Sequence, residues 1–569
     1  MRELSTDILI LGSGGAGLFA ALHAHKAAPE LAITVAVKGL LGKCGCTRMV
    51  QGGYNVALAR EDSVERHFMD TIVGGAWLSD QELAWKLVVL AIERIKELEN
   101  ELGCFFDRNP DGTIHQKAFA GQTFDRTVHK GDLTGIEIIN RLAEQVWSRK
   151  INRLEEHRAV ELVKNNDGKS VAGVLFIDMR TGEYVFVRAK AVLLATGGGP
   201  TMYKYHTPSG EKTCDGLAMA LRAGLALRDM EMVQFHPTGL LAGTHTRMTG
   251  TVLEEGLRGA GGYLLNGAKE RFMPRYDPKG ERATRDLVSR AMYAEMRDGR
   301  TSPNGGLFIS MRHLGPDFVK KQFRGMVERC ADCGFDLAGG LVEVVPTAHY
   351  MMGGVEFAPD CTTALAGLFV AGEDSGGVHG ANRLGGNGVA NSTVFGAVAG
   401  DAMAAWVRDA GHREPDGAAI EAAMAFCELP LKKKPGSGNL ESVREALYAL
   451  MWDKVGIIRD GAGLMQAQAR LESLDAELDS YCVPSAERAF NMTWHDWLNL
   501  KSLVAVSRAI AAAAVARRDS RGAHFRSDYP ECGPLESSTF TSIQDTVVTM
   551  KPVTFTRVAP GQTLLRHVA

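Results

Sequence analysis

Asp7-Ile-Leu-Ile-Leu-Gly-Ser-Gly-Gly-Ala-Gly17 is the stretch that decides the fold. Residues 7–11 are an apolar run that predicts a buried strand, and the glycines after it lead into a helical stretch ending near Ala28. A second strand is predicted at residues 33–37. In such a βαβ unit the glycines let a pyrophosphate approach the helix N-terminus, whose free N–H groups favour anions. The sequence therefore predicts a dinucleotide site at Gly12, Gly14, Gly15, Ala16 and Gly17.

Later strand ends point to the same nucleotide. Apolar runs at residues 192–196 and 367–371 both end in glycine turns, and parallel strands of a doubly wound sheet meet ligands at their carboxyl ends. Lys38 stands at the end of the second predicted strand, where an acidic residue usually holds a ribose, so the common NAD interpretation loses weight. We expect these positions to contact the nucleotide: Lys38, Ala195, Thr196, Gly197 and Glu373.

Length and composition restrict the class of protein. With 569 residues the chain is too long for one hydrophobic core, and 45% hydrophobic and 23% charged residues are typical of a globular multidomain enzyme. Because 64 Lys and Arg nearly balance 67 Asp and Glu, we expect neither nucleic-acid binding nor a polybasic membrane anchor. No uninterrupted run of about 18 apolar residues occurs, so the sequence predicts no membrane span.

The ten cysteines are scattered, and the first residues do not combine a charged segment with an apolar signal core. We therefore expect free thiols in a reducing cytoplasm. Cys330-Ala-Asp-Cys333 has no second pair at zinc or iron-sulfur spacing, which favours ordinary thiols over a bound metal. Any iron-sulfur cluster would then belong to another subunit.

The remaining pattern predicts an α/β protein with a Rossmann-type nucleotide-binding domain, an inserted α+β capping domain, a helical bundle and short terminal strands. A mixed segment begins near Gln234, helical periodicity runs from residue 414 to 518 after a turn at residues 434–438 is allowed for, and residues 546–558 alternate apolar and polar side chains. The predicted domains are residues 1–235 and 355–412 for the nucleotide, 236–354 for the cap, 413–530 for the helices and 531–569 for the strands.

Two phrases place basic side chains beside glycine-rich turns: residues 348–354, with His349, and residues 379–387, with Arg383. A cation among small, turn-forming residues is costly to bury unless something negative meets it. The phrases therefore favour a pocket for an anionic substrate. The alternatives are that the histidines are structural and that the arginines form ordinary salt bridges.

With these residues in view, the chain resembles, nearly from end to end, the flavoprotein subunit of succinate dehydrogenase and fumarate reductase, in the wider family that includes L-aspartate oxidase. The resemblance rests on the glycine turn at residues 12–17 and on residues 51–53, 70–77, 234–239, 284–286, 346–350, 379–387 and 520–524. It implies FAD as the cofactor, with contacts at further positions: Thr47, Gly52, Gly53, Asp215, Asn387 and Val389.

The resemblance also implies a reaction. A hydride passes between flavin N5 and one carbon of a dicarboxylate, and a proton is exchanged at the neighbouring carbon. Arg285 is implied as the proton-transferring residue, with Glu255 and Arg258 as its relay. Arg383 and His349 would hold one substrate carboxylate, since a guanidinium can bind it in a bidentate manner, and His236 would lie at the other end.

Two positions refine the substrate. Aspartate oxidases carry a glutamate where this chain has Phe119, so Phe119 counts against an aspartate oxidase. Gln51 is similar to the succinate dehydrogenase choice, where many fumarate reductases have glutamate. Ordinary packing is the alternative for both residues.

The chain departs from the family pattern at two places. Cys46 replaces the histidine that many members bond to the flavin 8α-methyl, so we expect noncovalent FAD, with a thioether through Cys46 as the rival. Glu254 replaces a threonine that helps to hold a carboxylate. Two like charges about 4 Å apart would cost on the order of 4 kcal/mol, so Glu254 must be protonated, turned away or facing a cationic or hydroxyl-bearing substrate end.

The sequence thus predicts an FAD-dependent succinate dehydrogenase or fumarate reductase type enzyme that acts on a small carboxylate. We expect it to work with a separate iron-sulfur subunit, in the cytoplasm or at the inner face of the membrane through its partners. The rivals are an oxidase or dehydrogenase acting on a substituted succinate, amino acid or ester, and a noncatalytic flavin-binding subunit.

Overall fold

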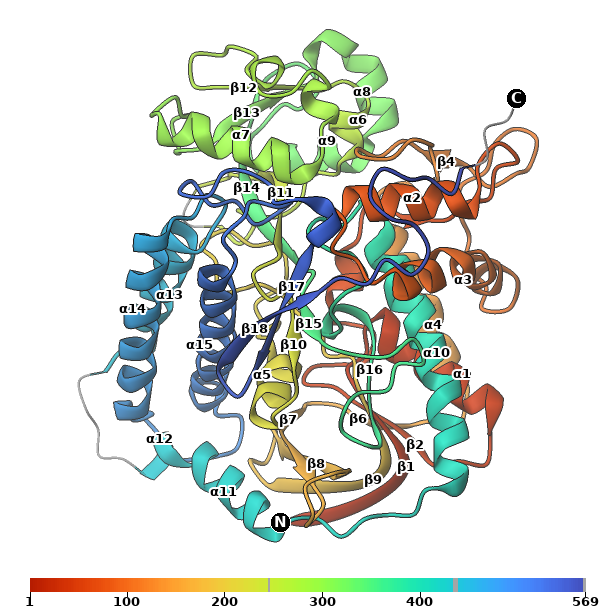
Figure 1. The fold of residues 1–569 in the computed structure, drawn as a ribbon, viewed down its shortest axis with the longest axis vertical. Coiled ribbons are helices and arrows are strands. Elements are labelled where there is room, and N and C mark those ends of the chain that lie inside the picture. The colour runs from red at the N-terminus through yellow and green to blue at the C-terminus, as the bar shows by residue number, and fades with distance from the viewer. Residues whose placement is uncertain (244–245, 433–437, 566–569) are drawn as a thin grey trace.

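A mostly parallel sheet forms the centre of the computed structural model, which describes residues 1–243, 246–432 and 438–565 (Figure 1). Strands β1, β2, β6, β9 and β16 pair in parallel, and β7 and β8 extend the sheet in antiparallel fashion. The strands are β1 (Arg2–Leu11), β2 (Ile33–Ala36), β6 (Asn152–Leu154), β7 (His157–Lys164), β8 (Val171–Asp178), β9 (Tyr184–Leu194) and β16 (Leu368–Val370). This arrangement confirms the α/β fold class.

Helix α1 (Gly15–Ala27) follows β1 directly and packs along α10 (Asn387–Asp409). Small residues make the close approach possible. A Cβ on Gly396 would lie 2.6 Å from the Ala16 carbonyl oxygen, and one on Gly400 would lie 2.5 Å from that of Ala20. Neither distance is tolerable for a real Cβ, so the glycines set how deeply the two helices interlock. Their N-termini consequently point to the same region.

The inserted segment builds a second sheet with its own hydrophobic core. Strands β11 (Val233–Leu240), β14 (Val342–Met351), β13 (Leu307–Ser310) and β12 (Tyr263–Leu265) pair antiparallel in that order. The helices here are α6 (Gly256–Gly259), α7 (Arg285–Arg297), α8 (Pro316–Gln322) and α9 (Arg324–Ala331), with short turns at Met273–Arg275, Gly280–Arg282 and Arg312–Leu314. Figure 1 shows this part, in green, above the carboxyl ends of the central strands.

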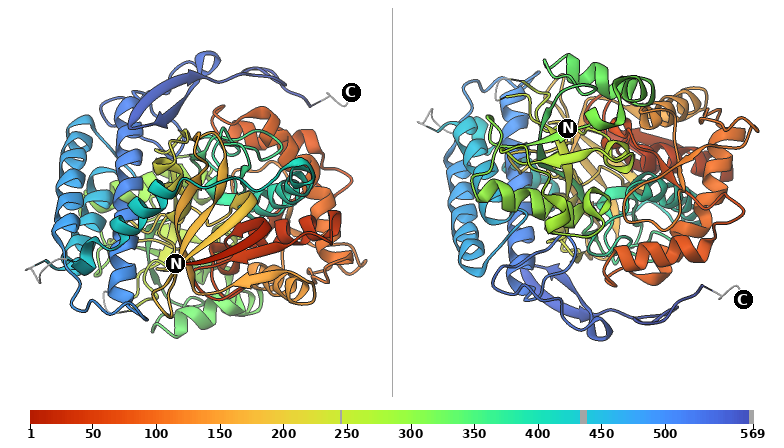
Figure 2. Two further views of the ribbon diagram at one scale, coloured as in Figure 1. Left: turned by 90° about the horizontal axis from the view of Figure 1, so that it is seen from below. Right: turned by 90° about the horizontal axis from the view of Figure 1, so that it is seen from above.

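The helical region predicted from periodicity comprises α11 (Gly417–Cys427), α12 (Leu429–Lys432), α13 (Leu440–Lys454), α14 (Gly461–Ser480) and α15 (Met492–Ala516). Figure 2 shows these helices along one side of the molecule. Asp416, Asn439, Asp460 and Asn491 cap four of them by accepting backbone N–H groups. Most of the turn predicted at residues 434–438 lies outside the described residues. By length and composition, α15 could cross a membrane, but 67% of its apolar window is buried in the fold, as in a core helix.

The C-terminal prediction of edge strands is confirmed, although the hairpin starts earlier than the alternating pattern. Strands β17 (Thr539–Gln544) and β18 (Val547–Pro552) pair antiparallel and extend β10 (Leu227–Arg228) and β15 (Gly354–Val355) into one sheet. A smaller sheet joins β3 (Tyr54–Asn55), β5 (Thr127–Val128) and β4 (Gln116–Lys117). The other elements are α2 (Val64–Gly74), α3 (Gln81–Asn100), α4 (Thr134–Trp147), α5 (Asp215–Arg222) and short turns at Cys46–Met49, Gly372–Asp374 and Leu535–Ser537.

Candidate active site

A cavity of about 460 Å³ lies between the carboxyl ends of the central strands and the inserted segment. Its wall runs from the glycine turn after β1, past the loop at residues 45–53, to β14, the start of α10 and the first residue of α7. The cavity therefore joins the predicted nucleotide site to the predicted substrate residues.

The nucleotide end has the shape that a pyrophosphate requires. Helices α1 and α10 both begin at this cavity, and their N-cap residues are the glycines Gly14 and Gly386. Free backbone N–H groups at a helix N-terminus favour phosphate. Gly12 has φ +111°, and a Cβ there would lie 2.2 Å from the Ala195 carbonyl oxygen. The residues present thus fit a dinucleotide such as FAD.

Most of the predicted cofactor residues border this cavity. Those that line it are Gly14, Gly15, Ala16, Cys46, Thr47, Gly52, Gly53, Ala195, Thr196, Gly197, Glu373 and Val389. Thr47 also accepts the Gly15 N–H at its Oγ1, at 3.1 Å. Burial raises the pKa of Glu373 to about 7, although its carboxylate accepts the Met351 N–H at 2.9 Å.

The other predicted cofactor residues lie elsewhere. Gly12, Lys38 and Asp215 line a smaller neighbouring cavity, where Lys38 Nζ and Asp215 Oδ2 are 2.8 Å apart. Gly17 packs against the turn itself, since a Cβ there would lie 2.0 Å from the Gly12 carbonyl oxygen. The side chain of Asn387 is engaged by protein groups, namely Asn55, His67 and Thr71. Asn387 therefore fixes the start of α10 instead of facing the cavity through its side chain.

Arg285 and Arg383 converge on one amide oxygen. Arg285 Nη1 and Arg383 Nη2 both donate to Gln234 Oε1, each at 3.0 Å. The Arg383 guanidinium also lies 4.4 Å from the centre of the Tyr350 ring. Burial, together with the charge of Arg285, lowers the pKa of Arg383 to about 10. Buried and only partly compensated, the two cations form a site that an anion would stabilise.

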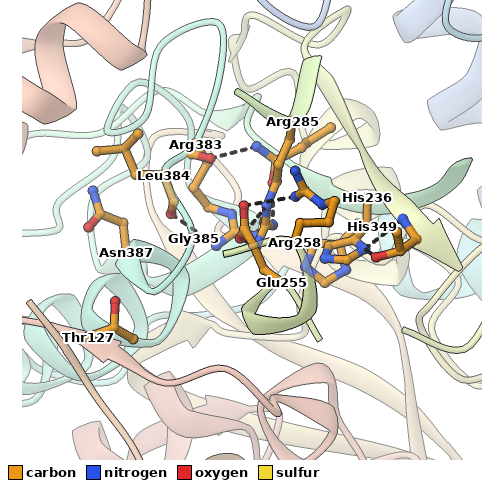
Figure 3. Close-up of polar contacts among 12 residues, drawn as sticks. Thr127, His236, Glu255, Arg258, Arg285, His349, Arg383, Leu384, Gly385 and Asn387 are labelled. Carbon is orange, nitrogen blue, oxygen red and sulfur yellow. Dashed lines mark hydrogen bonds and ion pairs between the residues drawn. The ribbon is translucent and has the colours of Figure 1, made fainter. Parts of the chain in front are cut away.

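Glu255 connects Arg285 to Arg258. Its Oε2 accepts Arg285 Nη2 at 2.6 Å and Nε at 3.0 Å, and its Oε1 accepts Arg258 Nη2 at 3.0 Å. Figure 3 shows the two guanidinium groups gathered around this carboxylate. Burial alone would raise the pKa of Glu255, but the two arginines outweigh it and hold the pKa below its ordinary value. The three side chains are thus one continuous hydrogen-bonded chain.

His236 and His349 lie side by side, with ring centres 5.4 Å apart (Figure 3). The Thr238 N–H donates to His236 Nδ1, and Thr207 Oγ1 lies 2.8 Å from His349 Nδ1. Burial, with the nearby charge of Arg285, holds the pKa of both histidines well below the ordinary value. Both rings are therefore neutral near pH 7 and can serve as hydrogen-bonding groups without added charge.

The two positions thought to refine the substrate also line the cavity. Phe119 packs on Gly52 and Gly385, since a Cβ on either glycine would come within 2.6 Å of its ring. Gln51 donates from Nε2 to the Val252 carbonyl oxygen at 3.0 Å. Glu254 also lines the cavity, but its Oε2 is held by Lys117 Nζ at 3.0 Å. The protein itself thus supplies a cation for Glu254, which the sequence reasoning had not considered.

Sequence reasoning missed several residues at this site. Asp374 accepts the backbone N–H groups of Thr196 and Gly197, and Lys212 Nζ donates to the Thr196 carbonyl oxygen at 2.9 Å. Asp374 follows the strand β16 directly, so the rule that ligands lie at strand ends could have indicated it. Gln234 and Tyr350 stood inside quoted motifs without a role. Lys212 and Thr207 lie in an irregular loop that gives no pattern.

Cys330 and Cys333 lie in and after α9, with Cys330 buried and Cys333 partly buried. Among the residues that the structure describes, no group of three or more His, Cys, Asp or Glu side chains is arranged to hold a metal ion.

Comparisons with known proteins agree with this geometry. Residues 7–389 match the family model of an FAD binding domain, and residues 444–564 match that of the fumarate reductase flavoprotein C-terminus. In Methanothermobacter marburgensis, one of the subunits of fumarate reductase (CoM/CoB) is 40% identical over 93% of this chain and 95% of its own length. For the 8-methylmenaquinol:fumarate reductase flavoprotein subunit of Wolinella succinogenes, the identity is 35% over 92% of this chain and 86% of that protein.

A solved structure matches over the whole chain. The FrdA chain of E. coli quinol fumarate reductase, in a mutated form, superposes with a TM-score of 0.91 at 33% identity and covers 99% of both chains. Both parts of the sequence and the fold therefore give the same answer: the chain is an FAD-dependent oxidoreductase and belongs to the succinate dehydrogenase and fumarate reductase flavoprotein family.

Proposed function

We propose that this protein interconverts a saturated and an α,β-unsaturated small dicarboxylate of the succinate and fumarate type. The observation that carries the proposal is the chain Arg258–Glu255–Arg285, which ends at the cavity wall beside Arg383. FAD, when bound, supplies the hydride donor or acceptor at its N5 atom. The protein must then deliver or remove a proton at the neighbouring substrate carbon.

Arg285 is the proposed proton-transferring residue. An arginine is a poor base in water because its pKa exceeds about 12. Here its Nε and Nη2 hydrogens already point to Glu255, whose second oxygen is joined to Arg258. A proton lost from Arg285 to substrate can therefore be replaced through Glu255, and the burial of all three side chains keeps bulk water from competing for it.

Substrate carboxylates are proposed to bind at two places. Arg383, held in place by Gln234 and the Tyr350 ring, can meet one carboxylate in a bidentate manner, with His349 beside it. His236 lies next to His349 and would donate to the other carboxylate as a neutral ring. With the substrate bridging these groups, a reacting carbon lies within the reach of Arg285.

FAD is proposed to bind without a covalent bond. Cys46 stands where a linking histidine would be, and burial, with Glu373 nearby, raises the pKa of its thiol. A neutral thiol is a weak nucleophile, which disfavours a thioether. Acid precipitation tests this directly: we expect a colourless pellet and an unmodified Cys46 peptide in the mass spectrum, whereas a yellow pellet with flavin mass on that peptide would establish the thioether.

Electrons are proposed to leave or enter through a separate iron-sulfur subunit. The related proteins are named as individual subunits of fumarate reductases, which supports a partner for this chain. The protein is expected in the cytoplasm, with any membrane association made through partner subunits. Copurification on a tagged chain should yield a cysteine-rich partner with bound iron; recovery of the chain alone, from cells grown under several conditions, would contradict this part.

Anaerobic stopped-flow spectroscopy tests the main proposal. Addition of succinate to the oxidised protein, or of fumarate to the reduced protein, should change the flavin absorbance near 450 nm on the timescale of turnover. An oxidase would also be bleached, but its colour would return rapidly in air with formation of hydrogen peroxide. A flavin that responds to no small carboxylate, amino acid or ester would point to the noncatalytic alternative.

A further inference from the structure

Lys117 and Glu254 form an ion pair at the cavity wall between two separate parts of the fold. Lys117 ends the short strand β4, which belongs to the small sheet beside the cavity. Glu254 comes from the inserted segment, directly before Glu255 and helix α6. Lys117 Nζ and Glu254 Oε2 are 3.0 Å apart, and the side chains are 17% and 6% exposed. The pair is therefore nearly dry and lies next to the proton relay.

The surroundings make Glu254 depend on this lysine. Burial raises the pKa of Glu254, and Asp132, in the loop before α4, acts in the same direction. Lys117 from β4 and Arg329 from α9 act against it. Only Lys117 among these groups donates a hydrogen bond to the carboxylate, and Arg329 instead donates to the Val252 carbonyl oxygen at 3.1 Å. Without Lys117, an ionised Glu254 would stand at the wall with distant compensation only.

A carboxylate at this wall opposes the task of the cavity. The substrate residues Arg285, Arg383 and the two histidines are arranged for an anion, and Glu254 lines the same cavity. An unpaired negative charge there would repel each carboxylate that enters, and the low dielectric of a buried site strengthens the repulsion. The same charge would also act on its neighbour Glu255, whose ionised state belongs to the relay.

We propose that Lys117 is a specificity-determining residue, because it supplies the counter-charge that allows this cavity to bind a dicarboxylate beside Glu254. This inference rests on the proposed function. It assigns a role to a residue that touches neither the flavin end of the cavity nor the relay. It also makes the pair, and not Glu254 alone, the feature that sets the charge of the substrate pocket.

A double-mutant cycle tests the inference in the FAD-loaded full-length protein. The four proteins are the wild type, Lys117→Met, Glu254→Gln and the double variant, and Lys130→Met is a matched control because Lys130 pairs with Asp107 and not with Glu254. The measured quantities are the dissociation constant of malonate, followed by the flavin absorbance, and KM for the dicarboxylate that the wild type turns over.

We expect Lys117→Met to weaken malonate binding at least tenfold at pH 8, with a smaller defect at pH 6 because the unpaired Glu254 then takes up a proton. Glu254→Gln should bind malonate as tightly as the wild type or more tightly, and the double variant should return to within threefold of it. The inference is overturned if Lys117→Met binds normally, or if the double variant is as weak as Lys117→Met, which would mean a merely structural strut. A wild type that responds to no dicarboxylate would instead contradict the proposed function.

Discussion

Arg285 and Glu255 are joined by two hydrogen bonds to a single oxygen, from Nη2 at 2.6 Å and from Nε at 3.0 Å. The second oxygen of Glu255 is left for Arg258. This division means that Glu255 can pass a proton between the arginines without turning its side chain. The geometry also keeps the Arg285 Nη1 group free of the relay, because that group donates to Gln234.

Replacement of Glu255 by glutamine should separate binding from chemistry. The amide keeps the size of the side chain but removes the charge and the proton-accepting oxygen, so we expect kcat to fall about 100-fold or more, as for the loss of a general acid or base. KM should change much less. Steady-state kinetics of Glu255→Gln and of the exposed control Glu270→Gln provide the measurement. A variant that retains kcat within threefold would show that the proton reaches Arg285 by another route.

Gln234 should be needed to hold the two arginines at the correct separation. In Gln234→Leu both guanidinium groups lose their shared acceptor, and a buried donor without a partner costs about 1–3 kcal/mol. We therefore expect KM for the dicarboxylate to rise about tenfold. Gln234→Glu keeps an acceptor oxygen and should retain more binding at low pH than Gln234→Leu, whereas the surface change Gln544→Leu should have no effect. Equal KM values for Gln234→Leu and the wild type would rule out this positioning role.

The sequence predicted the nucleotide turn and the residues around the reaction because both follow local rules. A strand, a glycine turn and a helix are contiguous, and His236, Arg285, His349 and Arg383 each lie in a short motif. All four were expected to meet, and all four line one cavity. This agreement follows from family motifs that record a shared geometry, since periodicity alone would not bring residues so distant in sequence together.

What escaped prediction depends on tertiary contacts with no local signal. Lys117 meets Glu254 across 137 positions of sequence, from a strand of two residues that is too short to show alternation. Gln234 gained its role only through two arginines that lie far from it in the chain. Lys38 was expected at the nucleotide, but Asp215 holds it. Charge pairing of this kind is decided by packing, which a pattern in one sequence does not record.

Glu373 should make stability depend on pH. Burial raises its pKa from the ordinary 4.5 to about 7, so in this window the folded protein holds a proton that the unfolded chain releases. The folded state is therefore favoured below the window and loses at most about 3 kcal/mol as the pH rises through it. In Glu373→Gln this loss is absent. The difference in Tm between variant and wild type should thus be larger at pH 8 than at pH 5.

The surface variant Glu487→Gln is the control for that measurement, and its Tm should follow the wild type at both pH values. A Tm difference for Glu373→Gln that is the same at pH 5 and pH 8 would mean that Glu373 does not change its protonation across the window.

Arg290 should transmit the position of the helical region to the reacting arginine. It lies on α7, the helix that begins with Arg285, and its Nη1 donates to the Gly522 carbonyl oxygen at 2.6 Å. The next residue, Ala523, donates its N–H to the Ala381 carbonyl oxygen at 2.8 Å, two positions before Arg383. The loop at residues 520–524 is therefore tied both to the helix of Arg285 and to the loop of Arg383.

In Arg290→Gln the tie to Gly522 is lost, so we expect kcat to fall about tenfold or less because Arg285 is less well placed, with malonate binding weakened by a smaller factor. Arg290→Lys keeps a donor and a charge near Asp286, 3.3 Å from Arg290 in the wild type, and should recover part of kcat. Arg297→Gln, at the far end of α7, serves as the matched control. If Arg290→Gln lowers Tm but leaves kcat and malonate affinity at the control values, the loop stabilises the fold without positioning the active site.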